Sequence, residues 1–187
     1  MEGPAKLRRE KGGGPRRTAL LLIDFINALD FDGGARFAPA ALRAARATAR
    51  LRDRLGSNVV TIYANDNFGD WTSDLRRVVA SCAARGSNGA AMTRLLAPRE
   101  GDLFVLKPRH SAFYQTPLDI LLESLQVHRL ILAGVTTDMC VLFTANDAYL
   151  RGYELVIPPT CTAAMTPSCH REAMSYLKRV CKAGTAP

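Results

Sequence analysis

The chain has 187 residues, a formal net charge of +8 and 48% hydrophobic residues. That length allows one domain with a full hydrophobic core, so its stability requires neither disulfides nor a structural metal. No apolar run approaches the roughly 18 residues of a membrane span, and the run that follows the basic N-terminal segment is too short for a signal peptide. We therefore expect a soluble, cytoplasmic protein.

Half of the net charge lies at the N-terminus. Residues 1–17 contain six basic and two acidic side chains, a net of +4, together with three consecutive glycines. This segment has almost no apolar residues, so it cannot bury enough surface to offset the entropy lost on ordering. We expect a basic, disordered tail over residues 1–17 and one domain over residues 18–187.

Five short runs rich in Val, Ile and Leu are apolar on both faces, which is typical of buried strands in a parallel sheet. They are Ala19 to Ile23, Asn58 to Tyr63, Leu103 to Leu106, Leu130 to Ala133 and Glu154 to Ile157. Segments of helical period alternate with them. Such alternation predicts right-handed crossovers and a three-layer α/β/α domain with a doubly wound, mainly parallel sheet.

Four helices are predicted from apolar spacing and from residues that favour helix ends. They run from Pro39 to Leu55, from the N-cap Thr116 onward, from near Thr137 to Arg151, and from Thr166 to about Val180. The stretch from Gly86 to Gly89 is predicted to be a surface loop.

Three chemically capable residues stand where strands end. Asp24 ends the first strand, Lys107 ends the third, and Cys140 follows the fourth by one tight turn. Each has an ordinary alternative, respectively a turn residue, a solvated strand end and a core cysteine. In a doubly wound sheet, however, ligands bind outside the carboxyl ends of the strands, so the joint placement of the three favours a site.

Cys140 is expected in the first turn of a helix, where unpaired N–H groups and the helix dipole favour thiolate over thiol. An ammonium from Lys107 would favour thiolate further, and Asp24 is suited to move the thiol proton. Together they make a hydrolytic site that requires no metal.

Three motifs resemble the isochorismatase-like cysteine hydrolases. They are LLLIDFIN from Leu20 to Asn27, KPRHSAF from Lys107 to Phe113 and GVTTDMCV from Gly134 to Val141. The resemblance implies that Asp24, Lys107 and Cys140 are the catalytic triad. It also implies a six-stranded parallel sheet of Rossmann type, a cis peptide between Val135 and Thr136, an oxyanion hole at the amides of Thr136 and Cys140, and a homo-oligomer.

The resemblance also suggests the reaction. Members of this family hydrolyse C–N bonds of amides and carbamoyl groups, or the vinyl ether of isochorismate. We expect a small amide, carbamoyl or ureido substrate and a Cys140 thioester, with no cofactor. The alternatives are a vinyl ether hydrolase, or a small-molecule binding module that has lost catalysis.

Nicotinamidases of this family bind a divalent metal through an Asp-x-His motif and a further His after the second strand. In this chain the segment from Asn65 to Trp71 contains no histidine. The three histidines, His110, His128 and His170, lie elsewhere and lack ligand spacing. We therefore expect no metal, which argues against nicotinamide as the substrate.

Several residues near the strand ends are candidates for binding a small-molecule substrate. They are Phe25, Asn27, Asn67, Trp71, Phe113 and Val135. The aromatic members are equally suited to pack a core or a subunit interface. Arg109 and His110 are suited to a substrate carboxylate or to a solvated surface.

Neither the arginines nor the remaining cysteines indicate a second function. Arg43, Arg46, Arg50 and Arg54 form a basic stripe on one helix, but no aromatic residues are interleaved with it, so we expect no nucleic-acid partner. Four cysteines lack C-x-x-C spacing and are expected to be ordinary thiols.

Overall fold

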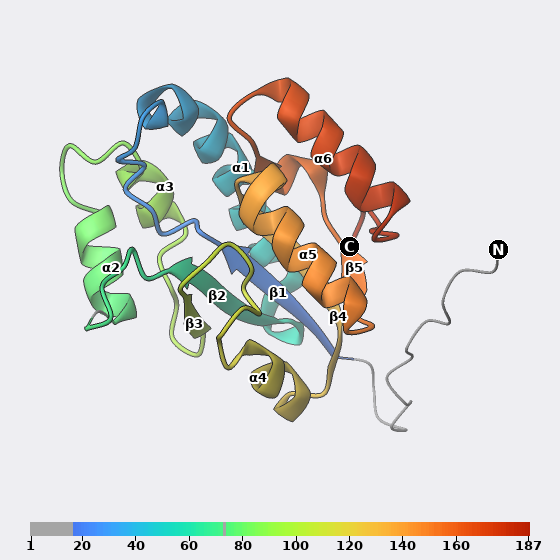
Figure 1. The fold of residues 1–187 in the computed structure, drawn as a ribbon. Coiled ribbons are helices and arrows are strands. Elements are labelled where there is room, and N and C mark those ends of the chain that lie inside the picture. Colours follow the sequence, from blue (N-terminus) through green and yellow to red (C-terminus); the bar gives the residue numbers. More distant parts are fainter. Residues whose placement is uncertain (1–16, 73) are drawn as a thin grey trace.

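A six-stranded sheet forms the middle layer of the computed structural model, which describes residues 17–72 and 74–187 (Figure 1). The strand order is β3-β2-β1-β4-β5, β6 also pairs with β4, and every pair is parallel. The strands are β1 (Arg17–Ile23), β2 (Val60–Asp66), β3 (Leu103–Lys107), β4 (Val127–Val135), β5 (Glu154–Val156) and β6 (Thr162–Ala163). The direction of winding reverses between β1 and β4, which confirms the predicted doubly wound sheet and its six strands.

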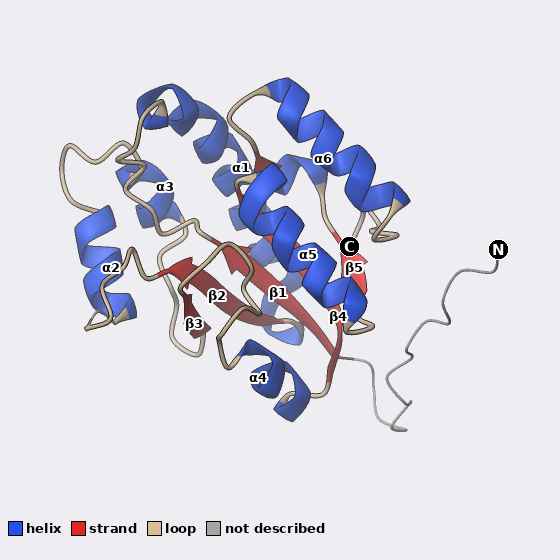
Figure 2. Cartoon of the chain, viewed as in Figure 1, coloured by secondary structure: helices blue, strands red, loops and turns tan. Residues whose placement is uncertain are grey.

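Helices cover both faces of the sheet (Figure 2). They are α1 (Gly34–Leu55), α2 (Leu75–Cys82), α3 (Ala90–Leu95), α4 (Leu118–Ser124), α5 (Leu142–Leu150) and α6 (Pro167–Arg179). Three short helical turns join these elements, namely η1 (Gly56–Asn58), η2 (Thr137–Val141) and η3 (Pro159–Cys161). The turn η2 has π-helical geometry. Over residues 17–72 and 74–187, no helix is long and apolar enough to cross a membrane.

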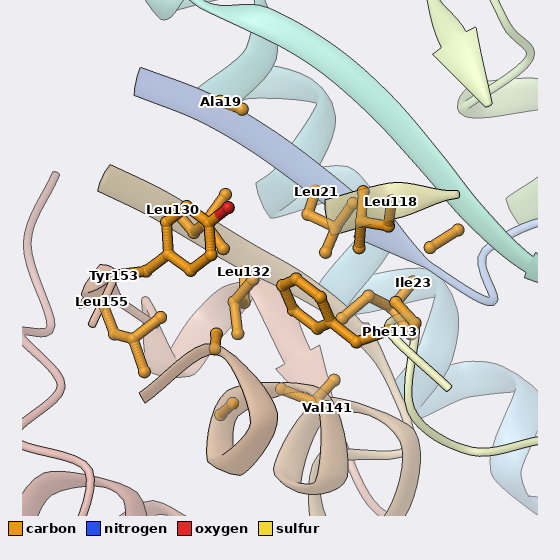
Figure 3. Close-up of a cluster of buried hydrophobic side chains, with 14 of the residues drawn as sticks. Ala19, Leu21, Ile23, Phe113, Leu118, Leu130, Leu132, Val141, Tyr153 and Leu155 are labelled. Carbon is orange, nitrogen blue, oxygen red and sulfur yellow. The ribbon is translucent and has the colours of Figure 1, made fainter. Parts of the chain in front are cut away.

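Successive side chains of β1 belong to two different cores because strand side chains alternate between faces. Leu21 and Ile23 pack in the core beneath α4, α5 and α6, which Figure 3 shows with Phe113 and Val141 around them. Leu20 packs in the other core, beneath α1, α2 and α3. This central strand is therefore buried on both faces, as its continuous apolar run predicts.

Several predicted boundaries differ from the structure. Helix α1 begins at Gly34, five residues before Pro39, because Phe37 packs in the core and adds a turn to the helix. Strand β2 extends through two polar residues, and the side-chain amide of the first, the buried Asn65, donates to the backbone oxygen of Ile26. The short helices α2 and α3, on either side of the predicted loop at 86–89, were not anticipated.

Two predicted helix starts are refined, and one residue of the predicted tail belongs to the sheet. The helix expected from Thr137 consists of η2 followed by α5. Helix α4 begins at Leu118, although the Thr116 hydroxyl still accepts a hydrogen bond from its N–H. Arg17, assigned to the tail, is the first residue of β1, and the rest of the predicted tail lies outside the described residues.

Strands β1 and β4 approach closely at Gly134. This residue pairs with Ile23, and a Cβ placed on it would lie 2.3 Å from the backbone oxygen of Ile23. Backbone cannot move away as a flexible side chain can, so only glycine fits here. The close approach brings the turn after β4 next to the end of β1.

We predict that Gly134→Ala lowers the free energy of unfolding by about 2 kcal/mol, because the added methyl overpacks two central strands. The melting temperature should fall by about 6 °C, as measured by circular dichroism. Gly184→Ala is the control, since the nearest atoms to its added Cβ lie 3.7 Å away. Equal melting temperatures for the two variants would contradict the steric argument.

Candidate active site

Three strands deliver Asp24, Lys107 and Cys140 to one edge of the sheet. Asp24 directly follows β1, Lys107 is the last residue of β3, and Cys140 lies in η2, just beyond β4. The Nζ of Lys107 lies 2.8 Å from Oδ2 of Asp24 and 3.6 Å from Sγ of Cys140. The three residues predicted from the strand ends are therefore in contact.

The Asp24 carboxylate is held from both sides. Its Oδ1 accepts a hydrogen bond from the N–H of Asp66 at 2.8 Å, and its Oδ2 pairs with Lys107. The backbone of Asp24 has a φ of 54°, in the left-handed region, where a non-glycine residue is strained. Its N–H is nevertheless bonded to the oxygen of Ala64, so the turn that aims the carboxylate is fixed by β2.

Lys107 is fully buried and surrounded by acceptors. Its Nζ lies 3.7 Å from Oδ2 of Asp66 and donates a hydrogen bond to the backbone oxygen of Arg109 at 3.2 Å. Burial lowers the pKa of a lysine, but Asp24, Cys140 and Asp66 together outweigh this effect and raise the pKa of Lys107. The ammonium therefore stays charged within the site.

Cys140 is half-buried, and the Lys107 ammonium lies 3.6 Å from its sulfur. Burial raises its pKa to about 12, the Asp24 charge acts in the same direction, and Lys107 opposes both. Lys107 therefore favours thiolate as expected, but burial and the Asp24 charge outweigh it and favour the thiol in the free site. Burial also raises the pKa of Asp24, against the effect of Lys107.

The turn between β4 and Cys140 is tightly organised. The peptide between Val135 and Thr136 is cis, which confirms that prediction. The backbone oxygen of Thr136 accepts hydrogen bonds from the N–H groups of Met139 and Val141, at 3.3 and 3.2 Å. Oγ1 of Thr137 lies 2.9 Å from Nδ1 of His170 on α6. The oxyanion hole at Thr136 and Cys140 stays a prediction.

The predicted substrate-binding residues fall into different environments. Phe25 and Phe113 pack in the two cores, and Val135 is buried in the core beneath α1. Trp71, in contrast, is 80% exposed. Full burial in the core leaves little of a ring free to touch a ligand. Both phenylalanines therefore fit the alternative reading, in which they pack in the core.

The two predicted asparagines use their side-chain oxygens locally. Oδ1 of Asn27 accepts from the N–H of Leu29, and Oδ1 of Asn67 accepts from the N–H of Gly69. The N–H of Asn67 donates to the backbone oxygen of Lys107 at 3.1 Å, which places Asn67 beside the triad. Asn67 thus adjoins the site through its backbone.

Sequence reasoning missed two residues in contact with the triad. Asp66 touches both Asp24 and Lys107, and its position at the end of β2 follows the rule that located the other three. The Nδ1 of His110 lies 3.9 Å from Sγ of Cys140. The sequence analysis considered His110 only as a carboxylate ligand or a solvated residue, because loop geometry cannot be derived from a pattern.

A family model described as the isochorismatase domain matches residues 18–186. The chain belongs to the isochorismatase family. As an isochorismatase-family chain it is a hydrolase, so the predicted family, fold and enzymatic character are confirmed.

This isochorismatase-family hydrolase is similar to three proteins that differ in their named activities. It is 36% identical over 163 residues to the uncharacterized isochorismatase family protein YaaI of Bacillus subtilis, covering 87% of this chain and 89% of YaaI. It is 36% identical over 96 residues to the ureidoacrylate amidohydrolase RutB of Methylobacterium radiotolerans, covering 51% of this chain but only 37% of RutB. A crystal structure of nicotinamidase PncA from Bacillus subtilis matches with a TM-score of 0.71 and 28% identity, covering 91% of this chain and 99% of PncA.

The residues of this hydrolase do not match the donors that a nicotinamidase-type metal site requires. Asp66 contacts the Lys107 ammonium and Asn67 is bonded to Gly69, while His110 and His170 contact Cys140 and Thr137. Within residues 17–72 and 74–187, no three His, Cys, Asp or Glu side chains are grouped to hold a metal ion.

We predict that Asp24→Asn makes Cys140 react faster with iodoacetamide at pH 8, although it removes the proposed proton acceptor. Without the carboxylate, Lys107 alone acts on the sulfur, and each unit by which the pKa of Cys140 falls gives about tenfold more thiolate. In the wild type the raised pKa keeps the thiol protonated, so its alkylation rate should still be rising at pH 9.

Mass spectrometry of the labelled peptides measures these rates. The half-buried thiol of Cys169 in the same protein is the internal control and should react equally in both variants. Slower alkylation of Cys140 in Asp24→Asn would refute the assignment of Asp24 as the group that raises its pKa.

Proposed function

We propose that this chain is a metal-independent cysteine hydrolase that cleaves a C–N bond of a small amide, carbamoyl or ureido compound. One observation carries the proposal: the Lys107 ammonium lies 2.8 Å from the buried Asp24 carboxylate and 3.6 Å from the Cys140 sulfur. That arrangement joins a nucleophile, a proton acceptor and a cation in one water-poor place.

In the proposed first half-reaction, the Cys140 sulfur attacks the substrate carbonyl carbon while Asp24 takes the thiol proton. The C–S bond forms and the carbonyl electrons move to oxygen. Collapse of this intermediate breaks the C–N bond, and Asp24 returns the proton to the leaving nitrogen. The raised pKa values of Asp24 and Cys140 suit this exchange, because the proton passes between the two groups and is not released to solvent.

Lys107 and the turn after β4 are proposed to stabilise the charges that arise. The ammonium faces the carboxylate and the sulfur throughout, so it offsets whichever of them is negative. The amides of Thr136 and Cys140 are proposed to receive the developing oxyanion. Because Lys107 is already held between Asp24 and Asp66, it needs no rearrangement during the reaction.

The relatives support a C–N bond as the target. RutB is described as an amidohydrolase of ureidoacrylate and PncA as a nicotinamidase. The nicotinamidase-type metal donors are missing here, which favours a carbamoyl or ureido compound over nicotinamide. Among the predicted substrate contacts, Asn67 is the best placed because it adjoins Lys107.

We predict that Cys140→Ser lowers the turnover number by about 10⁴-fold or more, because the nucleophile is lost. The measurement is a turnover screen of ureido acids, carbamoyl amino acids, primary amides, nicotinamide and isochorismate. Cys169→Ser, which removes a half-buried thiol from α6, is the matched control and should keep full activity. Turnover of isochorismate alone, or full activity of Cys140→Ser on a proven substrate, would refute the proposed reaction.

We also propose that the protein forms a homo-oligomer. Ile120 on α4 and Leu150 on α5 are 73% and 69% exposed, and the two helices are joined by an ion pair of 3.4 Å between Asp119 and Arg151. Two large exposed side chains near such a junction suit a subunit interface.

We predict that light scattering during size-exclusion chromatography finds a dimer or tetramer. Ile120→Lys and Leu150→Lys should shift it toward the monomer, because a lysine at an apolar interface is costly to bury. A monomeric wild type at micromolar concentration would refute the oligomer.

A further inference from the structure

His110 lies on the solvent side of the Cys140 sulfur. Its Nδ1 is 3.9 Å from Sγ, and its ring packs against Phe143 of α5 with ring centroids 5.6 Å apart. The side chain itself is exposed. Asp24 and Lys107 are buried, so the sulfur adjoins both a buried ion pair and an exposed imidazole.

The loop that carries His110 is fastened on both sides of this residue. The backbone oxygen of Arg109 accepts a hydrogen bond from the catalytic Lys107 ammonium at 3.2 Å. The hydroxyl of Ser111 donates to Asp147 of α5, and the N–H of Ala112 donates to Thr144 of the same helix at 3.0 Å. The position of the imidazole over the sulfur is therefore set by the triad and by α5.

The second half-reaction needs a base that water can reach. The side chain of Asp24 is only 4% exposed, so water has little access to this carboxylate. Imidazole is the side chain best suited to accept a proton near neutral pH.

We propose that His110 is the general base that activates water to hydrolyse the Cys140 thioester, and that Asp24 serves only the acylation half-reaction. The inference rests on the proposed thioester mechanism. It assigns the two half-reactions to two different groups, the buried Asp24 and the exposed His110.

The step balances as follows. A nitrogen of the neutral imidazole takes a proton from water, and the oxygen of that water bonds to the thioester carbonyl carbon. The tetrahedral intermediate collapses with cleavage of the C–S bond, whose electron pair stays on sulfur. The imidazolium then protonates the sulfur, which restores the Cys140 thiol and neutral His110 and releases the carboxylic or carbamic acid.

An activated ester separates the two half-reactions without the natural substrate. With p-nitrophenyl acetate, the burst of p-nitrophenolate measures acetylation of Cys140, and the following steady rate measures hydrolysis of the acetyl-enzyme. For His110→Ala we expect a burst rate within about twofold of the wild type and a steady rate lower by about 100-fold. Peptide mass spectrometry should find acetyl-Cys140 accumulating in the variant.

Added free imidazole distinguishes a general base from a residue with only a structural role. Added imidazole should restore the steady rate of His110→Ala, because it can occupy the vacated space beside Phe143. His110→Asn, which keeps a hydrogen-bonding amide but has no basic nitrogen, should be as slow as His110→Ala. Tyr114→Ala, which removes an exposed ring from the same loop, is the control and should behave as wild type.

The outcomes distinguish this inference from the proposed function. A steady rate in His110→Ala equal to that of the wild type, an equal slowing of both phases, or a lack of imidazole rescue would overturn the role of His110 alone. A burst that is absent from the wild type, or that persists in Cys140→Ser, would overturn the Cys140 nucleophile and the role of His110 together.

Discussion

A buried ion pair between Asp24 and Lys107 holds the site together. The two residues end strands β1 and β3, which are separated by β2, and neighbouring strands lie about 4.8 Å apart. A lysine is long enough to reach across one strand, and Lys107 does so past Asp66 to meet Asp24 at 2.8 Å. Burying each charge costs several kcal/mol, so the pair persists only because hydrogen bonds complete it.

The same pair decides the state of the nucleophile. Burial and the nearby Asp24 charge both raise the pKa of Cys140, which favours the thiol over the thiolate in the free site. The proposed reaction therefore depends on proton exchange between Asp24 and Cys140, rather than on a thiolate present beforehand. The two proposed half-reactions then use different groups, the buried Asp24 for acylation and the exposed His110 for hydrolysis of the thioester.

The positions of the triad could be predicted because parallel strands end at a common edge, so a polar residue after each apolar run belongs to one region of space. The same argument failed for Asp66, because the predicted strand ended at Tyr63 whereas β2 continues through buried polar residues. Aromatic residues after strands were ambiguous for a related reason. Phe25 and Phe113 pack in the cores, whereas Trp71 is exposed. Which of these occurs depends on the space between neighbouring helices and strands.

The sequence by itself determined five of the strands and four of the helices, the edge of the sheet where Asp24, Lys107 and Cys140 meet, and the family. These follow from local patterns, since apolar period and strand ends are properties of short segments. Only the tertiary structure decided that Cys140 is held as a thiol, that Asp66 joins the triad and that His110 lies over the sulfur. Burial and through-space charge set a pKa, and both arise from residues far apart in the chain.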